Sequence, residues 1–278
     1  MRAAGSTLTF SRSPLPEALA GLAALGYTTV ELAALEGWAH VAPSCLAADF
    51  AAEAAAVRRA LAAAHLHVTA LNGGLGDVDG AEGLRRAGAL FRLATTLGAL
   101  VVTLPAGPAG APLHAVAARL GPLVAEAARY RVVLSVETHM GALTEDPAAA
   151  VALCRRVPGL KLTLDPSHYW AGLPQGQGWE AVLPFVAHVH LRDAGLGGWD
   201  AIQVWPGKGA VDFRRVAAAL SAVGYRGGCA VEYIDTLAVV GGGTAAEAAA
   251  EMARQAEAWD LSSPRTGETE AADPRGDR

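Results

Sequence analysis

Short apolar runs alternate with helical stretches eight times along this chain, and this alternation constrains the fold more than any other feature. The runs read as buried strands and cover residues 5–10, 28–32, 66–71, 99–104, 132–137, 161–165, 186–193 and 229–232. The helical stretches cover residues 14–25, 46–64, 81–97, 112–130, 146–156, 179–184, 212–223 and 244–259. Strands that alternate with helices indicate right-handed βαβ units and a parallel sheet, and eight such units match a closed barrel. We therefore predict an α/β fold, a single-domain (β/α)8 TIM barrel.

The predicted barrel domain spans residues 1–261, because no linker-like change in composition interrupts the sequence before its last residues. A length of 278 residues fits one such domain. Residues 262–278 are rich in Ser, Pro, Thr, Gly and charged residues. That composition is typical of disorder, so we predict a disordered C-terminal tail.

Charge and apolar patterning narrow the classes of function. The net charge is −5 and the basic residues are dispersed, which argues against nucleic-acid binding and favours a small-molecule substrate. The longest uncharged stretch, residues 93–113, is interrupted by glycines and prolines that exclude a membrane span, and the N-terminus lacks the apolar core of a signal peptide. The three cysteines form no CxxC pair, which indicates a reduced, cytoplasmic protein.

Four predicted strands end in an ionisable side chain, which a buried strand does not carry without a reason. These residues are Glu137, Asp165, His190 and Glu232, on the fifth to eighth strands. The carboxyl ends of barrel strands share one mouth, so we expect the four side chains to converge. Three carboxylates so close together require a cation. This donor set suits Mn²⁺, Mg²⁺ or Co²⁺, with Zn²⁺ as a further option.

Two alternatives stay open for these residues. Any one of them could instead cap a helix or pair with a nearby arginine. The choice of His190 over His188 follows from strand alternation: both face one side, and His190 lies nearer the mouth. His188 is then expected in the barrel core or behind the metal ligands.

The segments that carry these residues resemble the xylose isomerase-like superfamily of sugar phosphate isomerases and epimerases. The similar segments are VVLSVETH, LDPSH, HVHLRD, PGKGAVDF and GYRGGCAVEY, and the resemblance covers nearly the whole barrel. It implies that Glu137, Asp165, His190 and Glu232 bind one divalent metal and that Glu137 and Glu232 also transfer protons. The implied activity is isomerisation or epimerisation of a sugar, sugar acid or cyclitol, by proton transfer next to a metal-bound carbonyl through an enediolate.

Other polar and aromatic residues near the predicted mouth are candidates for substrate binding. His168 and His139 follow two of the metal-ligand strands, and Lys208 lies in a glycine-flanked loop after the seventh. Asn72 ends the third strand. Trp170 is one of several tryptophans in predicted loops, where an aromatic ring can pack on a sugar. Glu31 ends the second strand and is interpreted as a loop anchor or a substrate contact.

The sequence departs from two branches of the superfamily. Ketose 3-epimerases carry a glutamate and an arginine where this chain has Leu143 and Leu196, which argues against that strict activity. Strands three and four end at Asn72 and Pro105, without the additional metal-binding histidines of endonuclease IV. The main alternative is a metal-dependent dehydratase, a lyase acting on an inosose or a 3-dehydroshikimate-like keto compound. A non-catalytic binding barrel is a further reading, and a homo-oligomer is compatible with either enzyme.

Overall fold

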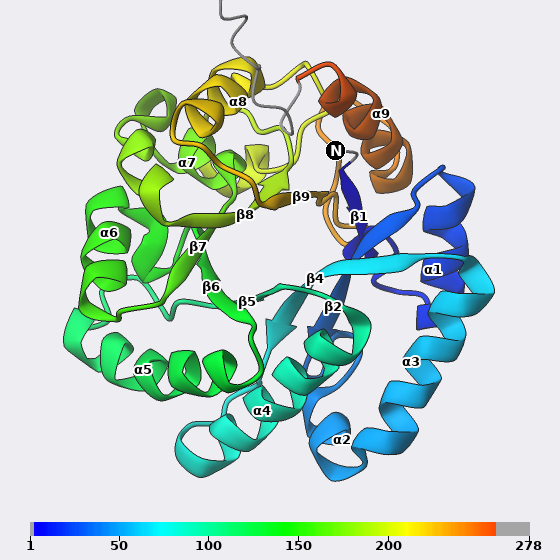
Figure 1. Ribbon diagram of the computed structural model, residues 1–278. Coiled ribbons are helices and arrows are strands. Elements are labelled where there is room, and N and C mark those ends of the chain that lie inside the picture. Colours follow the sequence, from blue (N-terminus) through cyan, green and yellow to red (C-terminus); the bar gives the residue numbers. More distant parts are fainter. Residues whose placement is uncertain (1–2, 260–278) are drawn as a thin grey trace, which may run out of the picture.

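The computed structural model describes residues 3–259, in which eight parallel strands form a closed barrel inside a ring of helices (Figure 1). The barrel closes because β1 pairs with both β2 and β9. A short ninth strand, β3 (Ala39–His40), pairs antiparallel with the end of β2. The barrel strands are β1 (Ala4–Ser6), β2 (Thr29–Leu35), β4 (His67–Gly74), β5 (Val101–Leu104), β6 (Val133–Glu137), β7 (Lys161–Leu164), β8 (Val186–Leu191) and β9 (Gly228–Val231). The predicted single TIM barrel is therefore confirmed.

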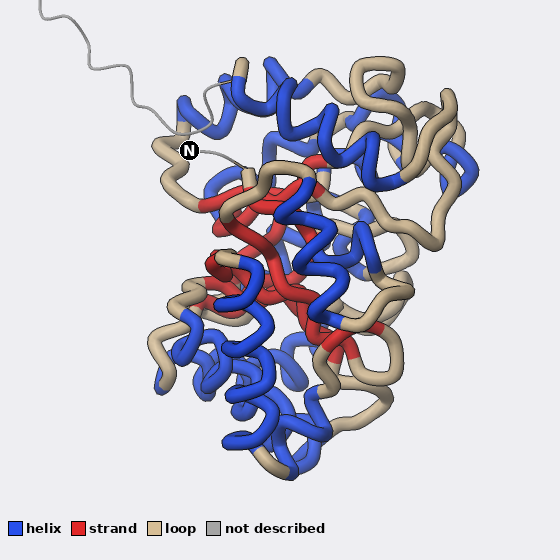
Figure 2. Tube along the Cα trace, turned by 90° about the vertical axis from the view of Figure 1, so that its right-hand side faces the viewer, coloured by secondary structure: helices blue, strands red, loops and turns tan. Residues whose placement is uncertain are grey.

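The helices cover the outside of the barrel, and in the side view the strands lie in the middle of the molecule (Figure 2). The α-helices are α1 (Leu15–Ala24), α2 (Pro43–Ala48), α3 (Phe50–Ala64), α4 (Gly80–Leu97), α5 (Leu113–Arg129), α6 (Pro147–Arg156), α7 (Pro166–Gly172), α8 (Phe213–Ala222) and α9 (Ala245–Glu257). The 3-10 segments are η1 (Thr7–Phe10), η2 (Leu143–Glu145), η3 (Pro174–Gly176), η4 (Trp179–Phe185) and η5 (Gly198–Ala201). Aliphatic side chains from helices and strands form one large core between the two layers.

Local sequence signals explain where several helices begin and end. The side chains of Asp146 and Asp212 accept backbone N–H groups at the starts of α6 and α8, as their positions predicted. Thr244 and Glu247 form a reciprocal capping box at the start of α9. Gly98 ends α4 in the left-handed conformation that glycine adopts without strain.

Four predicted elements differ from the structure. Residues 7–10 form η1 instead of extending the first strand, because the Ser6 hydroxyl accepts the Leu8 N–H and turns the chain. The predicted helix 46–64 is two helices, since Asp49 caps α3. Strand β2 runs on to Leu35, so Glu31 lies within the strand and not at its end. Residues 166–172 form α7 where a loop was expected.

The barrel interior is unusually polar for a packed core. The hydroxyl oxygens of Thr103, Ser135 and Thr163, on β5, β6 and β7, lie 2.7 to 3.2 Å apart, and all three side chains are buried. Glu31 and His188 are also buried inside the barrel, at the level of β2 and β8. The three hydroxyl groups hydrogen-bond one another, which offsets the cost of their burial.

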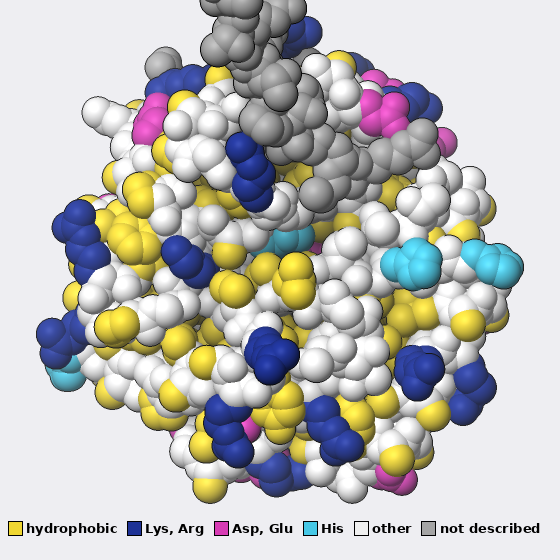
Figure 3. All heavy atoms as spheres, in the orientation of Figure 1, with side chains coloured by type: hydrophobic (Ala, Val, Ile, Leu, Met, Phe, Trp, Pro, Cys, Tyr) yellow, Lys and Arg dark blue, Asp and Glu magenta, His cyan; other side chains and the backbone are white. Residues whose placement is uncertain are grey.

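On the face drawn in Figure 3, the Lys and Arg side chains are spread among apolar and neutral groups and do not join into one block. Among residues 3–259, the helices are too short or too polar to cross a membrane. The predicted tail, residues 262–278, lies outside the described residues.

Candidate metal centre

The four predicted metal ligands converge at the carboxyl ends of their strands. Glu137 ends β6, Asp165 follows β7 and caps α7, His190 lies on β8, and Glu232 follows β9. Each offers one donor atom, and these atoms all lie within 4.8 Å of one another. Asp165, His190 and Glu232 are buried, and Glu137 is partly exposed. The set of one nitrogen and three oxygen donors matches the requirements of a hard or borderline divalent cation.

The ring of His190 lies between carboxylates on both of its nitrogens. Its Nδ1 is 2.9 Å from Glu137 Oε1 and 3.6 Å from Glu232 Oε2, while its Nε2 is 3.1 Å from Glu31 Oε1. A neutral imidazole carries only one N–H, so one nitrogen would turn a lone pair toward a carboxylate. The arrangement therefore requires a further proton beside His190, on the ring or on a facing carboxyl group, or a metal ion.

The pKa values of the cluster reflect this crowding. Burial by itself would lower the pKa of His190, but the charges of Glu232 and Glu31 and the hydrogen bond to Glu137 raise it well above its ordinary value. Burial raises the pKa of Glu232 to about 8; the charge of His190 opposes this shift, and the charge of Glu137 adds to it. Burial also acts to raise the pKa of Glu137, but the hydrogen bond and charge of His190 lower it overall. Without metal, the centre therefore holds protons in place of a cation.

Arg192 is a component of the site that the sequence analysis missed. Its guanidinium donates to Asp165 Oδ2 at 2.6 Å and to the Ser167 hydroxyl at 3.1 Å, and its Nη1 lies 3.5 Å from Glu232 Oε2. It also donates to His168 Nε2 at 2.9 Å. Strand alternation could have found it, because residues 188, 190 and 192 of the segment HVHLRD all point to one side. Arg192 compensates part of the negative charge of the cluster.

A cavity of about 260 Å³ opens above the four ligands. Glu137 and Glu232 lie on its wall, together with Arg192. The predicted substrate contacts Asn72, His139 and His168 also line it, as do Trp38 and Trp199 at its rim. The rings of His139 and His168 are 4.0 Å apart, and Trp199 lies against both, with ring centroids at 5.3 and 5.7 Å.

Two other predicted contacts lie away from this cavity. Trp170 belongs to α7 and is buried in the core against Trp179, with ring centroids 5.7 Å apart. Lys208 is exposed, and its Nζ donates to the Gly241 carbonyl. Neither side chain is part of the cavity wall.

The loop that carries Lys208 is folded around Asp193. One carboxylate oxygen accepts the Gly207 and Gly209 N–H groups at 2.9 and 3.0 Å, and the other accepts those of Ala194 and Val211 at 2.9 and 3.4 Å. These bonds explain the segment PGKGAVDF as a fixed turn whose lysine points away from the metal ligands.

Residues 19–256 match the family described as the xylose isomerase-like TIM barrel. The chain belongs to this family. The predicted resemblance is thereby confirmed at the level of the superfamily. No curated protein sequence matches the chain.

Solved structures of this family share the fold at low sequence identity. A xylose isomerase-like TIM barrel protein from Mycobacterium smegmatis, in complex with magnesium, has a TM-score of 0.74 at 19% identity, covering 91% of this chain and 94% of that chain. The probable 3-DHS dehydratase AsbF from Bacillus anthracis has a TM-score of 0.71 at 15% identity, covering 92% and 99%. A Methylomonas D-allulose 3-epimerase in complex with D-allulose has a TM-score of 0.71 at 18% identity, covering 93% and 96%. The same fold therefore occurs in an epimerase and in a probable dehydratase.

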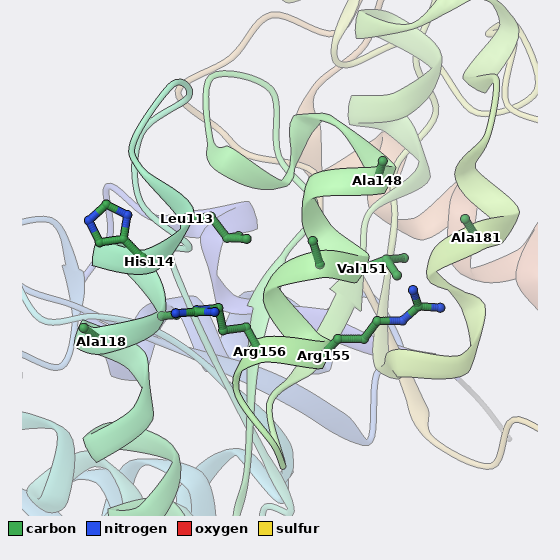
Figure 4. A pocket seen from close by; sticks show the side chains of 10 residues that line it. Leu113, His114, Ala118, Ala148, Val151, Arg155, Arg156 and Ala181 are labelled. Atoms are coloured by element: carbon green, nitrogen blue, oxygen red, sulfur yellow. The ribbon is translucent and has the colours of Figure 1, made fainter.

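A larger hollow of about 980 Å³ lies on the outer surface and not at the barrel mouth. Figure 4 shows that Arg155 and Arg156 come from α6 and His114 from α5, and several alanines also line the hollow. Its lining residues include no carboxylate. The hollow thus lacks the donor set of the barrel mouth, where the predicted ligands gather.

Proposed function

We propose that this protein is a divalent-metal-dependent isomerase or epimerase of a sugar, sugar acid or cyclitol. The observation that carries the proposal is the convergence of Glu137, Asp165, His190 and Glu232 within 4.8 Å, with the two glutamates on the wall of a cavity. Mn²⁺, Mg²⁺ or Co²⁺ is the expected ion, with Zn²⁺ next. The substrate is a small molecule, and the enzyme acts in the cytoplasm.

The short contact between His190 Nδ1 and Glu137 supports a cation at this point, because a metal ion would take the place of the proton that this contact requires. Asp165, His190, Glu137 and Glu232 would hold the metal. When bound, a divalent metal supplies Lewis-acid chemistry that stabilises negative charge on a substrate oxygen.

Proton transfer is assigned to Glu137 and Glu232, which both line the cavity and lie 2.9 and 3.6 Å from His190 Nδ1. One carboxylate removes a proton from the carbon next to a carbonyl and becomes a carboxylic acid, and a proton returns to the same or the adjacent carbon from whichever of the two residues is then protonated. Asn72 Nδ2 donates to Glu232 Oε1 at 2.9 Å and so fixes the orientation of that carboxylate.

His168 is suited to bind a substrate oxygen. Its Nε2 accepts the hydrogen bond from Arg192, so a neutral ring carries its proton on Nδ1. Burial, followed by the charge of Arg192, lowers the pKa of His168 well below its ordinary value, which keeps the ring neutral. Among the described residues, Nδ1 has no hydrogen-bond partner although it is buried. A substrate hydroxyl or carbonyl in the cavity would satisfy it.

A dehydratase is the second candidate, and Arg192 favours it. This residue places a fixed positive charge on the cavity wall, 3.5 Å from Glu232. A guanidinium in such a position can bind a substrate carboxylate, as a cyclic keto acid would present. The same carboxylate pair would then remove a proton and assist the departure of hydroxide.

The first test is metal content by elemental analysis of purified wild type and of His190→Ala, with His114→Ala as the matched control. His114 is an exposed histidine on the outer surface. We expect about one equivalent of metal in the wild type and the control, and its loss in His190→Ala. A metal-free wild type that also fails to bind each ion on incubation would refute the four-ligand site.

The second test separates the two activities. The metal-loaded protein is incubated with ketoses, inososes and dehydroshikimate, and the products are followed by chromatography and ultraviolet absorbance. An isomerase changes only the sugar, whereas a dehydratase produces a conjugated enone with new ultraviolet absorbance. If no substrate in these classes reacts while metal is bound, the catalytic proposal is wrong and a binding barrel becomes the better reading.

A further inference from the structure

A buried carboxylate inside the barrel connects two histidines on the opposite side. Glu31 lies within β2, and its side chain is fully buried. Its Oε1 atom is 3.0 Å from His188 Nε2 and 3.1 Å from His190 Nε2. The two imidazole rings stand nearly perpendicular, at 87°, so that both nitrogens reach the same oxygen.

An ionised carboxylate only accepts hydrogen bonds. His190 must therefore carry a proton on Nε2, directed at Glu31. With Nε2 protonated, the lone pair of a neutral His190 is on Nδ1, which faces Glu137 and Glu232. That nitrogen is the one beside two of the other three proposed ligands. The contact from Glu31 thus selects the ring tautomer that a metal at this centre needs.

We propose that Glu31 is a positioning residue that holds the His190 ring in the tautomer and orientation required for metal binding. His188 Nε2 lies 3.0 Å from the same oxygen, so the buried His188 ring packs beside the Glu31 carboxylate inside the barrel. The inference rests on the proposed metal centre and assigns a role to two residues outside its ligand set. Carboxylates behind a metal-binding histidine strengthen metal binding about 10- to 100-fold, which sets the expected size of the effect.

A competing use of the same atoms is a second metal site. Glu31, His188 and His190 also offer donor atoms within 4.8 Å of one another. A metal there would occupy His190 Nε2, so both nitrogens of one ring would have to bind metal and no N–H would remain for Glu31. The 3.1 Å contact from His190 Nε2 is a hydrogen bond to this carboxylate oxygen without an ion, whereas His188 Nε2, 3.0 Å away, has no hydrogen-bond partner among the described residues, so the number of bound metal ions decides between the two uses.

The test compares Glu31→Gln and Glu31→Ala with Glu36→Gln, a matched change of a glutamate near the end of the same strand. Glu36 contacts Ser44 and Arg86 and is remote from the proposed ligands. Mn²⁺ affinity and stoichiometry are measured by electron paramagnetic resonance of the free ion. We expect Kd to rise roughly 10-fold in Glu31→Gln and up to roughly 100-fold in Glu31→Ala, and to change less than about twofold in Glu36→Gln.

A second measurement reads the tautomer itself and is insensitive to general loss of stability. Long-range ¹H–¹⁵N spectra of Mg²⁺-loaded protein labelled with ¹⁵N-histidine distinguish a protonated Nε2 from a protonated Nδ1. We expect His190 to carry its proton on Nε2 in the wild type and in Glu36→Gln, and to lose this single state in Glu31→Gln. If Glu31→Ala fails to fold, the nearly isosteric Glu31→Gln variant provides both measurements.

The possible results distinguish a failure of the positioning role of Glu31 from a failure of the proposed metal centre. Wild-type protein that binds no Mn²⁺ refutes the metal centre, and the role of Glu31 falls with it. If the wild type binds one equivalent and Glu31→Gln binds it equally well with an unchanged tautomer, only the positioning role is refuted. Two equivalents of Mn²⁺ in the wild type, reduced to one in Glu31→Gln, would replace the positioning role with a second metal site.

Discussion

Metal binding at this centre should release protons, because protons hold the place of the cation when metal is absent. Burial raises the pKa of Glu232 to about 8, and the neighbouring carboxylates raise the pKa of His190 well above its ordinary value. A metal ligand must be deprotonated. The cation therefore has to displace the proton of Glu232 and the second proton of His190.

The size of the effect follows from the pKa of Glu232. At pH 7, a group with a pKa of about 8 is roughly 0.9 protonated, and at pH 9 it is roughly 0.1 protonated. Glu232 should thus contribute roughly 0.9 released protons at pH 7 and roughly 0.1 at pH 9. Metal binding should therefore weaken as the pH falls. Between pH 9 and pH 7, protonation of this group alone should lower the apparent metal affinity roughly tenfold.

Isothermal titration of Mn²⁺ into metal-free protein, repeated in buffers with different ionisation enthalpies, counts the released protons. We compare wild type with Glu232→Gln, which keeps an oxygen donor but has no proton to lose. The wild type should release roughly 0.9 more protons than the variant at pH 7, and nearly the same number at pH 9. Equal release at pH 7 would show that Glu232 is already ionised in the metal-free site, and the argument from crowded buried carboxylates would fail.

Three further variants test the site and its supports. Glu232→Gln should lower turnover roughly 10²- to 10⁴-fold with metal largely retained, measured as kcat and metal content; unchanged kcat would contradict its role in proton transfer. Gly209→Ala should lower the free energy of unfolding by roughly 1–3 kcal/mol in urea titrations, because a Cβ there would lie 2.1 Å from Asp193 Oδ1. Thr244→Ala removes half of a capping box and should lower the free energy of unfolding by about 1 kcal/mol. Thr96→Ala, at an exposed position within a helix, serves as the control. Equal losses of stability in the two variants would argue against the cap.

The fold was predictable because each unit carries its own local signals. Asp146 and Asp212 mark helix starts by their side chains alone, and the apolar runs between helices are too short for anything but strands. The convergence of the four strand ends follows from the same regularity, since parallel barrel strands present their carboxyl ends on one side. Helix α7 was also within reach, because Asp165-Pro166 repeats the cap-and-proline pattern of Asp146-Pro147.

The residues that the sequence did not place correctly are positioned by contacts with other elements of the barrel. The position of Glu31 is set by how far β2 extends, and that length comes from its pairing with β3 and β4 and not from its own residues. Trp170 looked like a loop tryptophan because the helix around it was not recognised, and only packing against Trp179 shows where its ring lies. Lys208 is oriented by a carboxylate fifteen residues earlier in the chain, Asp193, whose hydrogen bonds to backbone amides have no sequence signature.

The turn around Asp193 also determines which part of the barrel mouth can change in sequence. Two sets of contacts hold both ends of the loop 195–203. One set is the four hydrogen bonds to the Asp193 carboxylate. The other consists of the backbone bonds from Val204 N to the Asp193 carbonyl and from Gly195 N to the Ala201 carbonyl. Trp199, at the tip of that loop, reaches the cavity rim, while the proposed metal ligands belong to strand ends below it. The loop tip can therefore be exchanged for another sequence without moving the ligands. Substrate preference and metal chemistry would then be separable properties of the proposed enzyme, which makes residues 196–200 the place to begin altering its specificity.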